Sequence, residues 1–524
     1  MSRGLGLVRD MLMAGFFGTS LPMSAFVIAF TIPNLFRRLF GEGALSAAFV
    51  PVFIEARQKE GEERAWLLAR KVISLVGLFL AAVVLAGIIG ITLALKRPDL
   101  GGQLALTLAL LRIMLPYAVF ICLAALAMAI LNSYHHFALP AFAPCLLNVI
   151  WILAVLLICP WFGPNPESQI FAVAWAVFAA GLAQLGVQIP KLRSYGFRFG
   201  WALDLKDRYV RRVFGLMGPA SLGMAITQIN VLLDRLMAGW IAVWAPAALF
   251  FSERLIYFPQ GIFATALSTV LLPVFSGHAA RSDHGQILRT INYSLRNLLY
   301  VMIPASIGLL VLARPIVQMI FEWREFTDTS TDLTALALMF YAPGLLVFSL
   351  SKVFVPAFYA LQDTRTPVKV GIWTVGLKLA LSLTFILTWP LMWKHAGLAL
   401  ATVLAETVNG IVLAVLLYGR LGSPNWRSIG WSAGRCLAAA AVMGAATWFL
   451  HSYILSYFMG LEVGDKPAQI AAVLVSISGA VALYVGLTFA MRSPELGDVV
   501  RALRRRFLRS ERIQEAGEDV DGRK

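Results

Sequence analysis

The sequence predicts an all-α polytopic membrane protein with about 14 transmembrane helices. Of its 524 residues, 59% are hydrophobic and only 14% are charged, and the mean hydropathy is +0.77. Globular domains carry about 25% charged residues, so a water-soluble fold of this length would lack the polar surface it needs. Apolar stretches of the roughly 20 residues that a membrane span requires recur along the whole chain. Soluble enzymes, nucleic-acid modules and disulfide-rich secreted scaffolds are thereby excluded.

Apolar spans alternate with charged or Pro/Gly-rich breaks from one end of the chain to the other. The first six spans are expected at about 2–18, 22–56, 72–95, 104–133, 138–159 and 168–190. Six more are expected at about 213–241, 247–277, 297–313, 333–361, 366–389 and 395–418, and the last two at about 432–450 and 467–491.

The distribution of basic residues predicts the orientation of the chain. With the spans above, 29 of the 44 Lys and Arg residues fall in breaks on one side of the membrane, and six fall on the other. Cytoplasmic loops carry the excess of Lys and Arg. We therefore expect both termini in the cytoplasm.

A short repeat predicts how the spans are grouped. Residues 44–53 read ALSAAFVPVF and residues 266–275 read ALSTVLLPVF, with six identities in ten positions. These segments close the second and the eighth span, and transporters are often built from two related halves with the site between them. The sequence thus predicts an N-terminal lobe at 1–190, a cytoplasmic basic linker at 191–212, a C-terminal lobe at 213–418, two further helices at 419–491 and a basic cytoplasmic tail at 492–524.

Nine basic residues remain inside the spans, and each would cost about 2.5–3.5 kcal/mol at a helix centre facing lipid. They are Arg3, Arg9, Arg37, Arg38, Arg112, Arg235, Arg254, Lys352 and Lys378. So many buried cations predict a hydrated, cationic interior. Because guanidinium groups bind phosphate in a bidentate manner, this interior favours an anionic, phosphorylated cargo over a cationic drug.

The densest set of charges lies in the first two spans. Arg3 and Asp10 are seven residues apart and share one helical face, with Arg9 on another. In the second span, Arg38 and Glu42 can pair at i and i+4, which leaves Arg37 for a ligand. Other interpretations stay open: Arg37 and Arg38 as a snorkelling pair, Arg3 as a headgroup contact, and Arg9 with Asp10 as a structural ion pair.

The second half repeats a charge beside a helix break, since Arg254 follows Glu253 and precedes Pro259 and Gly261. Asp234 in the seventh span is either a cation-coupling ligand or half of a buried ion pair, and Arg235 beside it and Lys378 in the eleventh span favour the ion pair. Catalytic, metal-binding and ATP-binding motifs are lacking. We therefore expect no cofactor, and energy from an ion gradient, the membrane potential or consumption of the cargo downstream.

Four segments carry a resemblance to a known family. They are SRGLGLVRD at 2–10, PNLFRRLFGEGALSAAFVPVF at 33–53, ERLIYFPQGIFATALSTVLLPVFS at 253–276 and FYALQDTRTPVK at 358–369. Together they resemble the MurJ/MviN family of bacterial lipid II flippases in the MOP exporter superfamily. The resemblance implies fourteen helices, two six-helix lobes around a V-shaped cationic cavity, and a final helix pair that forms a groove for the lipid tail.

The resemblance also implies an activity and a location. The chain would carry lipid II, the undecaprenyl-diphosphate-linked peptidoglycan precursor, from the inner to the outer leaflet of the bacterial cytoplasmic membrane by alternating access. Membrane lipids and the cell-wall synthesis machinery would be its other partners, and nucleic acid would not. The cavity residues would be Arg3, Arg9, Asp10, Asn34, Arg37, Glu42 and Arg254, and Arg38 joins them from the charge pattern.

This sequence departs from the family pattern at three places. Ser24 stands where many members have an acidic residue, and the family's first helix usually begins well before the motif at 2–10. Asp234 and Thr402 match sodium ligands of some members, but Lys378 stands where an Asn is expected. Our hypothesis is that the Lys378 ammonium replaces sodium and pairs with Asp234.

Two other functions remain open on the sequence alone. An exporter of another polyprenyl-diphosphate-linked saccharide would need the same cationic cavity. A membrane enzyme acting on polyprenyl phosphates would need catalytic carboxylates or histidines in long polar loops, which this chain lacks.

Overall fold

The computed structural model describes residues 2–41, 44–460, 464–498 and 501, and every regular element in them is a helix. This confirms the predicted all-α class. Within the described residues, ten helices are long and apolar enough to cross a membrane. An eleventh arises if α15 (Asp328–Tyr341) and α16 (Gly344–Ala360), bent by 46°, form one span. The exact number of fourteen stays a prediction.

Contacts along the chain group it into two compact units. The first unit comprises Met1–Phe251, Ile320–Leu333 and Pro390–His395. The second unit comprises Ser252–Met319, Thr334–Trp389 and Ala396–Lys524. The lobe boundaries at 190 and 418 that the sequence suggested stay predictions.

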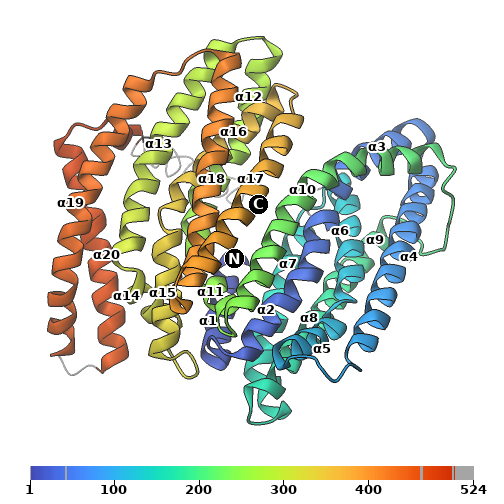
Figure 1. The fold of residues 1–524 in the computed structure, drawn as a ribbon. Helices are drawn as coiled ribbons and strands as arrows, with labels where there is room; N and C mark the ends of the chain where they lie inside the picture. Colours follow the sequence, from blue (N-terminus) through green and yellow to red (C-terminus); the bar gives the residue numbers. More distant parts are fainter. Residues whose placement is uncertain (1, 42–43, 461–463, 499–500, 502–524) are drawn as a thin grey trace, which may run out of the picture. The chain divides into compact units, whose positions relative to one another are not determined.

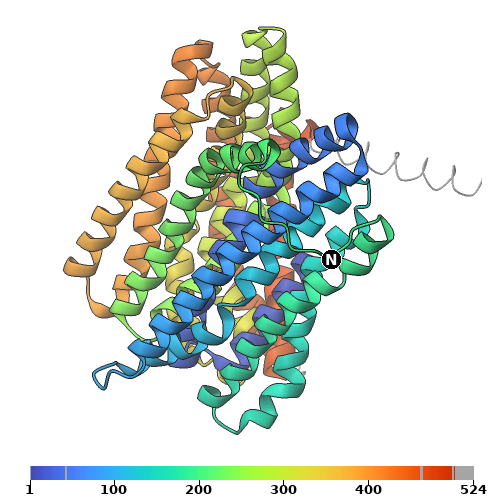
Figure 2. The ribbon, with the colours of Figure 1, turned by 90° about the vertical axis from the view of Figure 1, so that its right-hand side faces the viewer.

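The first unit is a bundle of helices (Figure 2). Its described residues also form two short π-helical turns and one 3₁₀ turn. Its elements are α1 (Ser2–Phe17), α2 (Leu21–Phe36), η1 (Arg37–Gly41), α3 (Ala44–Glu60), α4 (Glu62–Ala94), α5 (Gly102–Met114), α6 (Tyr117–Ser133), α7 (Ala138–Leu153), η2 (Ala154–Ile158), η3 (Cys159–Phe162), α8 (Pro166–Gly186), α9 (Ile189–Ser194) and α10 (Arg208–Ile241). Helix α2 packs on α5 and α10, α3 packs on α4 and α10, and α6 packs on α8.

The second predicted span is broken, as its proline and glycines suggest. Pro33 lacks a backbone N–H and weakens the end of α2, and the chain then forms the π-helical turn η1 before α3 begins at Ala44. A π-helical turn is rare and often marks a functional site. Arg37 and Arg38 are the first two residues of this turn.

The same order of elements returns at the predicted repeat. Helix α11 (Ala245–Gln260) contains Pro259, the π-helical turn η4 (Gly261–Thr265) follows, and α12 (Ala266–Ala280) begins at the repeated ALS sequence. Since α3 also begins at its ALS sequence, the ten-residue match marks equivalent helix starts after equivalent breaks.

The second unit is built around α13 (His284–Val311). Its other elements are η4, α12, α16, α17 (Arg365–Thr388), α19 (Trp426–Met459) and α20 (Asp465–Ala490). Among the described helices, four are divided between the two units: α11, α14 (Ala313–Phe321), α15 and α18 (Leu391–Leu421). Helices α19 and α20 lie side by side as an antiparallel pair, and α13 packs on α19 and α16 (Figure 1). Beyond α20, the fully buried Glu495 accepts hydrogen bonds from Arg296 on α13 at 2.6 Å and from Ser432 on α19 at 2.8 Å.

Candidate functional site

Arg9 on α1 is held from three directions. Its Nε and Nη2 donate to Oδ1 of Asp10 at 2.9 and 2.7 Å, and its Nη1 donates to Oδ1 of Asn148 on α7 at 2.9 Å. The guanidinium also lies 4.6 Å from the ring centroid of Trp151. Asp10 is 3% exposed. The ion pair considered for Arg9 and Asp10 is therefore present, and it neutralises the charge of Arg9 inside the unit.

Arg37 and Arg38 leave η1 in different directions. Nε of Arg37 donates to Oδ1 of Asn34, one turn earlier, at 2.8 Å. Nη1 of Arg38 lies 3.5 Å from Oε1 of Gln228 on α10. The predicted partner of Arg38, Glu42, lies outside the described residues, as does the side chain of Arg3.

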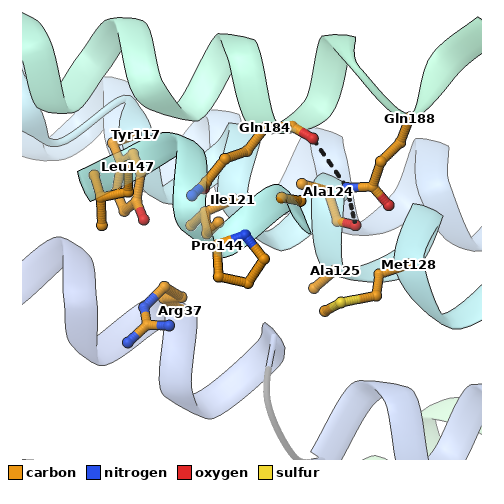
Figure 3. Close-up of a pocket in the computed structure, with 11 residues that line it drawn as sticks. Arg37, Tyr117, Ile121, Ala124, Ala125, Met128, Pro144, Leu147, Gln184 and Gln188 are labelled. Carbon is orange, nitrogen blue, oxygen red and sulfur yellow. Dashed lines mark hydrogen bonds between the residues drawn. The ribbon is translucent and has the colours of Figure 1, made fainter. Parts of the chain in front are cut away.

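Arg37 lines a cavity of about 70 Å³ within the first unit. The walls come from α6, α7, α8 and the turn after α8, and most of them are apolar (Figure 3). Their side chains are Tyr117, Ile121, Ala124, Ala125, Met128, Ala143, Pro144, Leu147, Gln184 and Gln188. The cavity is large enough for a few water molecules or a small polar group of a ligand.

Two glutamines contribute uncharged polar groups to the cavity. Nε2 of Gln188 donates to the backbone oxygens of Ala124 and Gln184 at 3.2 and 2.9 Å (Figure 3). These two bonds fix the amide, so that Oε1 of Gln188 is left as an acceptor. In the described structure, Oε1 of Gln188 and Oε1 of Gln184 are buried without a hydrogen-bond partner. A buried acceptor calls for a donor, so this wall suits the O–H or N–H groups of a ligand.

Asn148, Gln184 and Gln188 are absent from the sequence-predicted site. One signal could have found the glutamines: they stand four residues apart in an apolar span, and such residues share a helical face. Asn148 stands alone in its span, and only the fold brings it to Arg9.

Ser24 forms a structural hydrogen bond within the first unit. It is fully buried, and its Oγ accepts the backbone N–H of Ala247 at 3.3 Å. That N–H belongs to the first turn of α11, where helix N–H groups have no partner within the helix. A short hydroxyl is sufficient for this hydrogen bond.

Arg254 lies half-buried on α11 and belongs to the second unit. Its neighbour Glu253 accepts a hydrogen bond of 3.2 Å from the hydroxyl of Tyr341 on α15. Arg254 comes five residues before Pro259 and seven before the π-helical turn η4, whereas Arg37 follows Pro33 and is the first residue of η1. That Arg37 and Arg254 act on one cargo stays a prediction.

The expected ion-coupling residues are distributed over both units. Asp234 is half-buried on α10 in the first unit, and Lys378 is 3% exposed on α17 in the second. Thr402 donates to the backbone oxygen of Leu398 in its own helix at 3.0 Å. The pairing of Asp234 with Lys378 stays a prediction. Among the described residues, no group of three or more His, Cys, Asp or Glu side chains is placed to hold a metal ion.

The chain is similar to known proteins along most of its length. A family model described as lipid II flippase MurJ matches residues 13–464. The probable lipid II flippase MurJ of Vibrio cholerae serotype O1 is 35% identical over 86% of this chain and 86% of its own length. The lipid II flippase MurJ of Burkholderia cenocepacia is 32% identical over 94% of this chain and 95% of its own.

Solved structures share the fold. A lipid II flippase MurJ in an inward closed conformation matches with a TM-score of 0.75 and 23% identity, over 94% of this chain and 97% of that one. An inward-facing multidrug resistance MATE family transporter of the MOP superfamily matches with a TM-score of 0.63 and 13% identity, over 80% of this chain and 94% of that one.

Proposed function

The chain belongs to the MurJ family, and from this membership we propose that it flips lipid II from the cytoplasmic to the outer leaflet of the bacterial inner membrane. The observation that carries the proposal is the family match over residues 13–464. The family is one of transporters, so the chain acts by moving its cargo and not by changing a covalent bond. Its many apolar helices support a multi-pass protein of that membrane, and the excess of Lys and Arg in breaks on one side supports both termini in the cytoplasm.

The head group of the cargo is held by arginines from both halves of the chain. Arg37 and Arg254 take the diphosphate, with Arg3, Arg38, Asn34 and Glu42 around them. Support comes from the position of Arg37 in the π-helical turn η1 and of Arg254 in a proline-containing helix that leads into η4. Arg9 and Asp10 border this site, and their mutual pairing leaves the net positive charge to the other arginines.

Arg37 also connects the diphosphate to the cavity beside it. The buried acceptors of Gln184 and Gln188 suit the hydroxyl and amide donors that sugars and peptides carry, and Met128 and Leu147 suit their apolar parts. The polyprenyl tail stays in a groove of α19 and α20 while the two lobes alternate between inward and outward access.

Transport is driven without sodium at the Asp234 position. A buried ammonium such as that of Lys378, 3% exposed, requires an anionic partner, and Asp234 fills this role in the proposal. The membrane potential or consumption of lipid II at the outer face then supplies the energy. Purified protein in sodium chloride and in choline chloride of equal ionic strength should unfold at the same temperature. Stabilisation by sodium would contradict this part of the proposal.

Complementation tests the cargo and the site together. Cells depleted of their own flippase receive the wild type, Arg37→Ala, Arg254→Ala or Arg97→Ala, and membrane expression of each is measured. Arg97 is an exposed residue of the turn after α4 and serves as the matched control. We expect growth with the wild type and Arg97→Ala, and lysis with the other two variants.

The remaining outcomes separate cargo from site. Rescue by all four proteins would support lipid II as the cargo but would refute Arg37 and Arg254 as its ligands. Failure of a well-expressed wild type, with lipid II retained in the inner leaflet, would contradict lipid II as the cargo. It would favour another polyprenyl-diphosphate-linked saccharide.

A further inference from the structure

A row of large apolar side chains projects from the segment that joins α9 to α10. We call residues 198–206 the linker loop. Exposure alternates along it from 199 to 205, as in an extended chain whose successive side chains point to opposite sides. Its exposed apolar side chains are Phe199 (69%), Trp201 (71%), Leu203 (57%) and Leu205 (65%).

The opposite side of the linker loop is fastened to α4. The backbone N–H of Ala202 donates to Oγ of Ser74 at 3.2 Å, and Nζ of Lys71 donates to Oδ2 of Asp204 at 2.8 Å. Lys71 also reaches Asp207, just beyond the loop, at 2.7 Å. Because these bonds hold the even-numbered residues against α4, the odd-numbered side chains are directed away from the protein.

The position of Ser74 along α4 indicates how deep the linker loop lies in the membrane. Helix α4 has 33 residues and is therefore about 50 Å long. Lys71 is its last charged residue, and the 23 residues from Val72 to Ala94 would span about 34 Å, close to the roughly 30 Å of bilayer hydrocarbon. Ser74 lies at the start of this stretch, one turn before the exposed Leu78 and Phe79. With this stretch across the hydrocarbon, the tip of the loop would lie where the headgroups meet the acyl chains.

The charge around the linker loop is positive. Arg198 and Lys206 are exposed at its two ends, while the carboxylates of Asp204 and Asp207 are bound by Lys71. Tryptophan is enriched at the membrane interface because its ring is amphipathic, and basic residues there are attracted to anionic lipids.

We propose that the linker loop is an interfacial anchor, which inserts Trp201 and Leu203 among the acyl chains and binds anionic phospholipid headgroups through Arg198 and Lys206. Anionic phospholipid therefore binds this chain as a ligand, in addition to forming part of the bilayer around it. The inference depends only on the chain's spanning a membrane and is independent of the cargo.

Spin labels measure the depth directly. Nitroxides are attached at Trp201→Cys or Leu203→Cys in protein reconstituted into phosphatidylcholine nanodiscs containing phosphatidylglycerol. The four native cysteines are buried and should remain unlabelled. Glu63→Cys, exposed at the start of α4, is the aqueous control, and Leu85→Cys, 60% exposed, is the lipid control. We expect labels at 201 and 203 to collide more with oxygen than with a water-soluble nickel chelate, as at 85 and unlike at 63.

Two results would overturn the insertion. Nickel collisions at 201 and 203 as frequent as those at 63 would place the loop in water. Exclusion of both reagents would mean that another protein chain covers it.

Lipid charge tests the second half of the proposal. The ratio of oxygen to nickel collisions at 201 should be higher with phosphatidylglycerol than with phosphatidylcholine alone. This difference should vanish when Arg198→Gln and Lys206→Gln are combined in one protein. An equal ratio in both lipids for the protein with Arg198 and Lys206 intact would refute headgroup binding.

Discussion

Arg9 donates a hydrogen bond of 2.9 Å from Nη1 to Oδ1 of Asn148, and this bond joins α1 to α7 across 139 positions of the sequence. The same guanidinium binds Asp10 through two other nitrogens and lies over the ring of Trp151. Only a planar group with several donors can satisfy all three neighbours at once. The position therefore requires arginine and not merely a positive charge.

Replacement of Arg9 by lysine should show this requirement. Arg9→Lys keeps the charge but loses the bond to Asn148, and a hydrogen bond to a charged group contributes about 1.5–3 kcal/mol. We expect a lower unfolding temperature in detergent and no rescue of depleted cells. Arg97→Lys, at an exposed turn, should behave as the wild type. If Arg9→Lys were as stable as the wild type, the bond to Asn148 would be unimportant.

The two carboxylates that bind Lys71 should differ strongly in their contribution to stability. The side chain of Asp207 is 1% exposed, binds Lys71 and Arg64 at 2.7 and 2.8 Å, and caps α10. Asp204 is 42% exposed, pairs with Lys71 at 2.8 Å and accepts the backbone N–H of Lys206 at 2.9 Å. Removing one member of a buried ion pair costs about 3–5 kcal/mol, whereas an exposed pair contributes less than about 1 kcal/mol. In denaturation, Asp207→Ala should lose several times more stability than Asp204→Ala, and equal losses would contradict this assignment.

Asp207 should also make stability depend on pH. Burial raises the pKa of Asp207, but hydrogen bonds from Lys71 and the Tyr209 amide and the charge of Arg64 lower it to about 2. The usual pKa is about 3.9, so the ionised carboxylate stabilises the folded state above pH 4. This contribution, roughly 2 kcal/mol, is lost as the pH falls towards 2. Asp207→Asn keeps the helix cap but cannot titrate. Between pH 4 and pH 2, its free energy of unfolding should therefore decline by about 2 kcal/mol less than that of the wild type. An identical pH dependence in both proteins would refute it.

Parts of this architecture could be predicted from the sequence because they depend on local chemistry. Pro33 and Pro259 predict the helix breaks that the structure shows as the π-helical turns η1 and η4. Helix α13 begins at His284 and not near 297, because its first turns are polar and no apolar run marks them. The bond between Arg9 and Asn148 depends on how α1 packs on α7, which no spacing within either helix encodes.

Filling the cavity beside Arg37 should separate stability from transport. Ala143 lines the cavity and is 4% exposed, and a leucine there would occupy part of its 70 Å³. We expect Ala143→Leu to unfold within about 1 kcal/mol of the wild type, since added methylenes find space, but to fail in complementation. Ala141→Leu, at an exposed position of the same helix, should rescue growth. Full rescue by a stable Ala143→Leu would show that the cargo does not enter this cavity.

Replacing two glycines of α1 by alanine should change the stability of the protein in opposite directions. A Cβ on Gly15 would collide with the indole ring of Trp323. Two hydrogen bonds hold this ring in place. Nε1 of Trp323 donates to the backbone oxygen of Met11 at 2.9 Å, and the backbone N–H of Glu325 donates to the backbone oxygen of Gly15 at 3.0 Å. Overpacking of this kind costs about 1–3 kcal/mol. A Cβ on Gly6 would meet no atom within 4 Å.

We therefore expect Gly15→Ala to lower the unfolding temperature in detergent and Gly6→Ala to raise it, since alanine favours the helix by about 0.5–1 kcal/mol over glycine. The two variants carry the same substitution in the same helix, so helix propensity affects both alike and only the contact with Trp323 differs. Trp323→Leu should remove the obstacle, so that Gly15→Ala costs less in that background than alone. An undiminished cost there would mean that the indole is not what requires glycine at position 15.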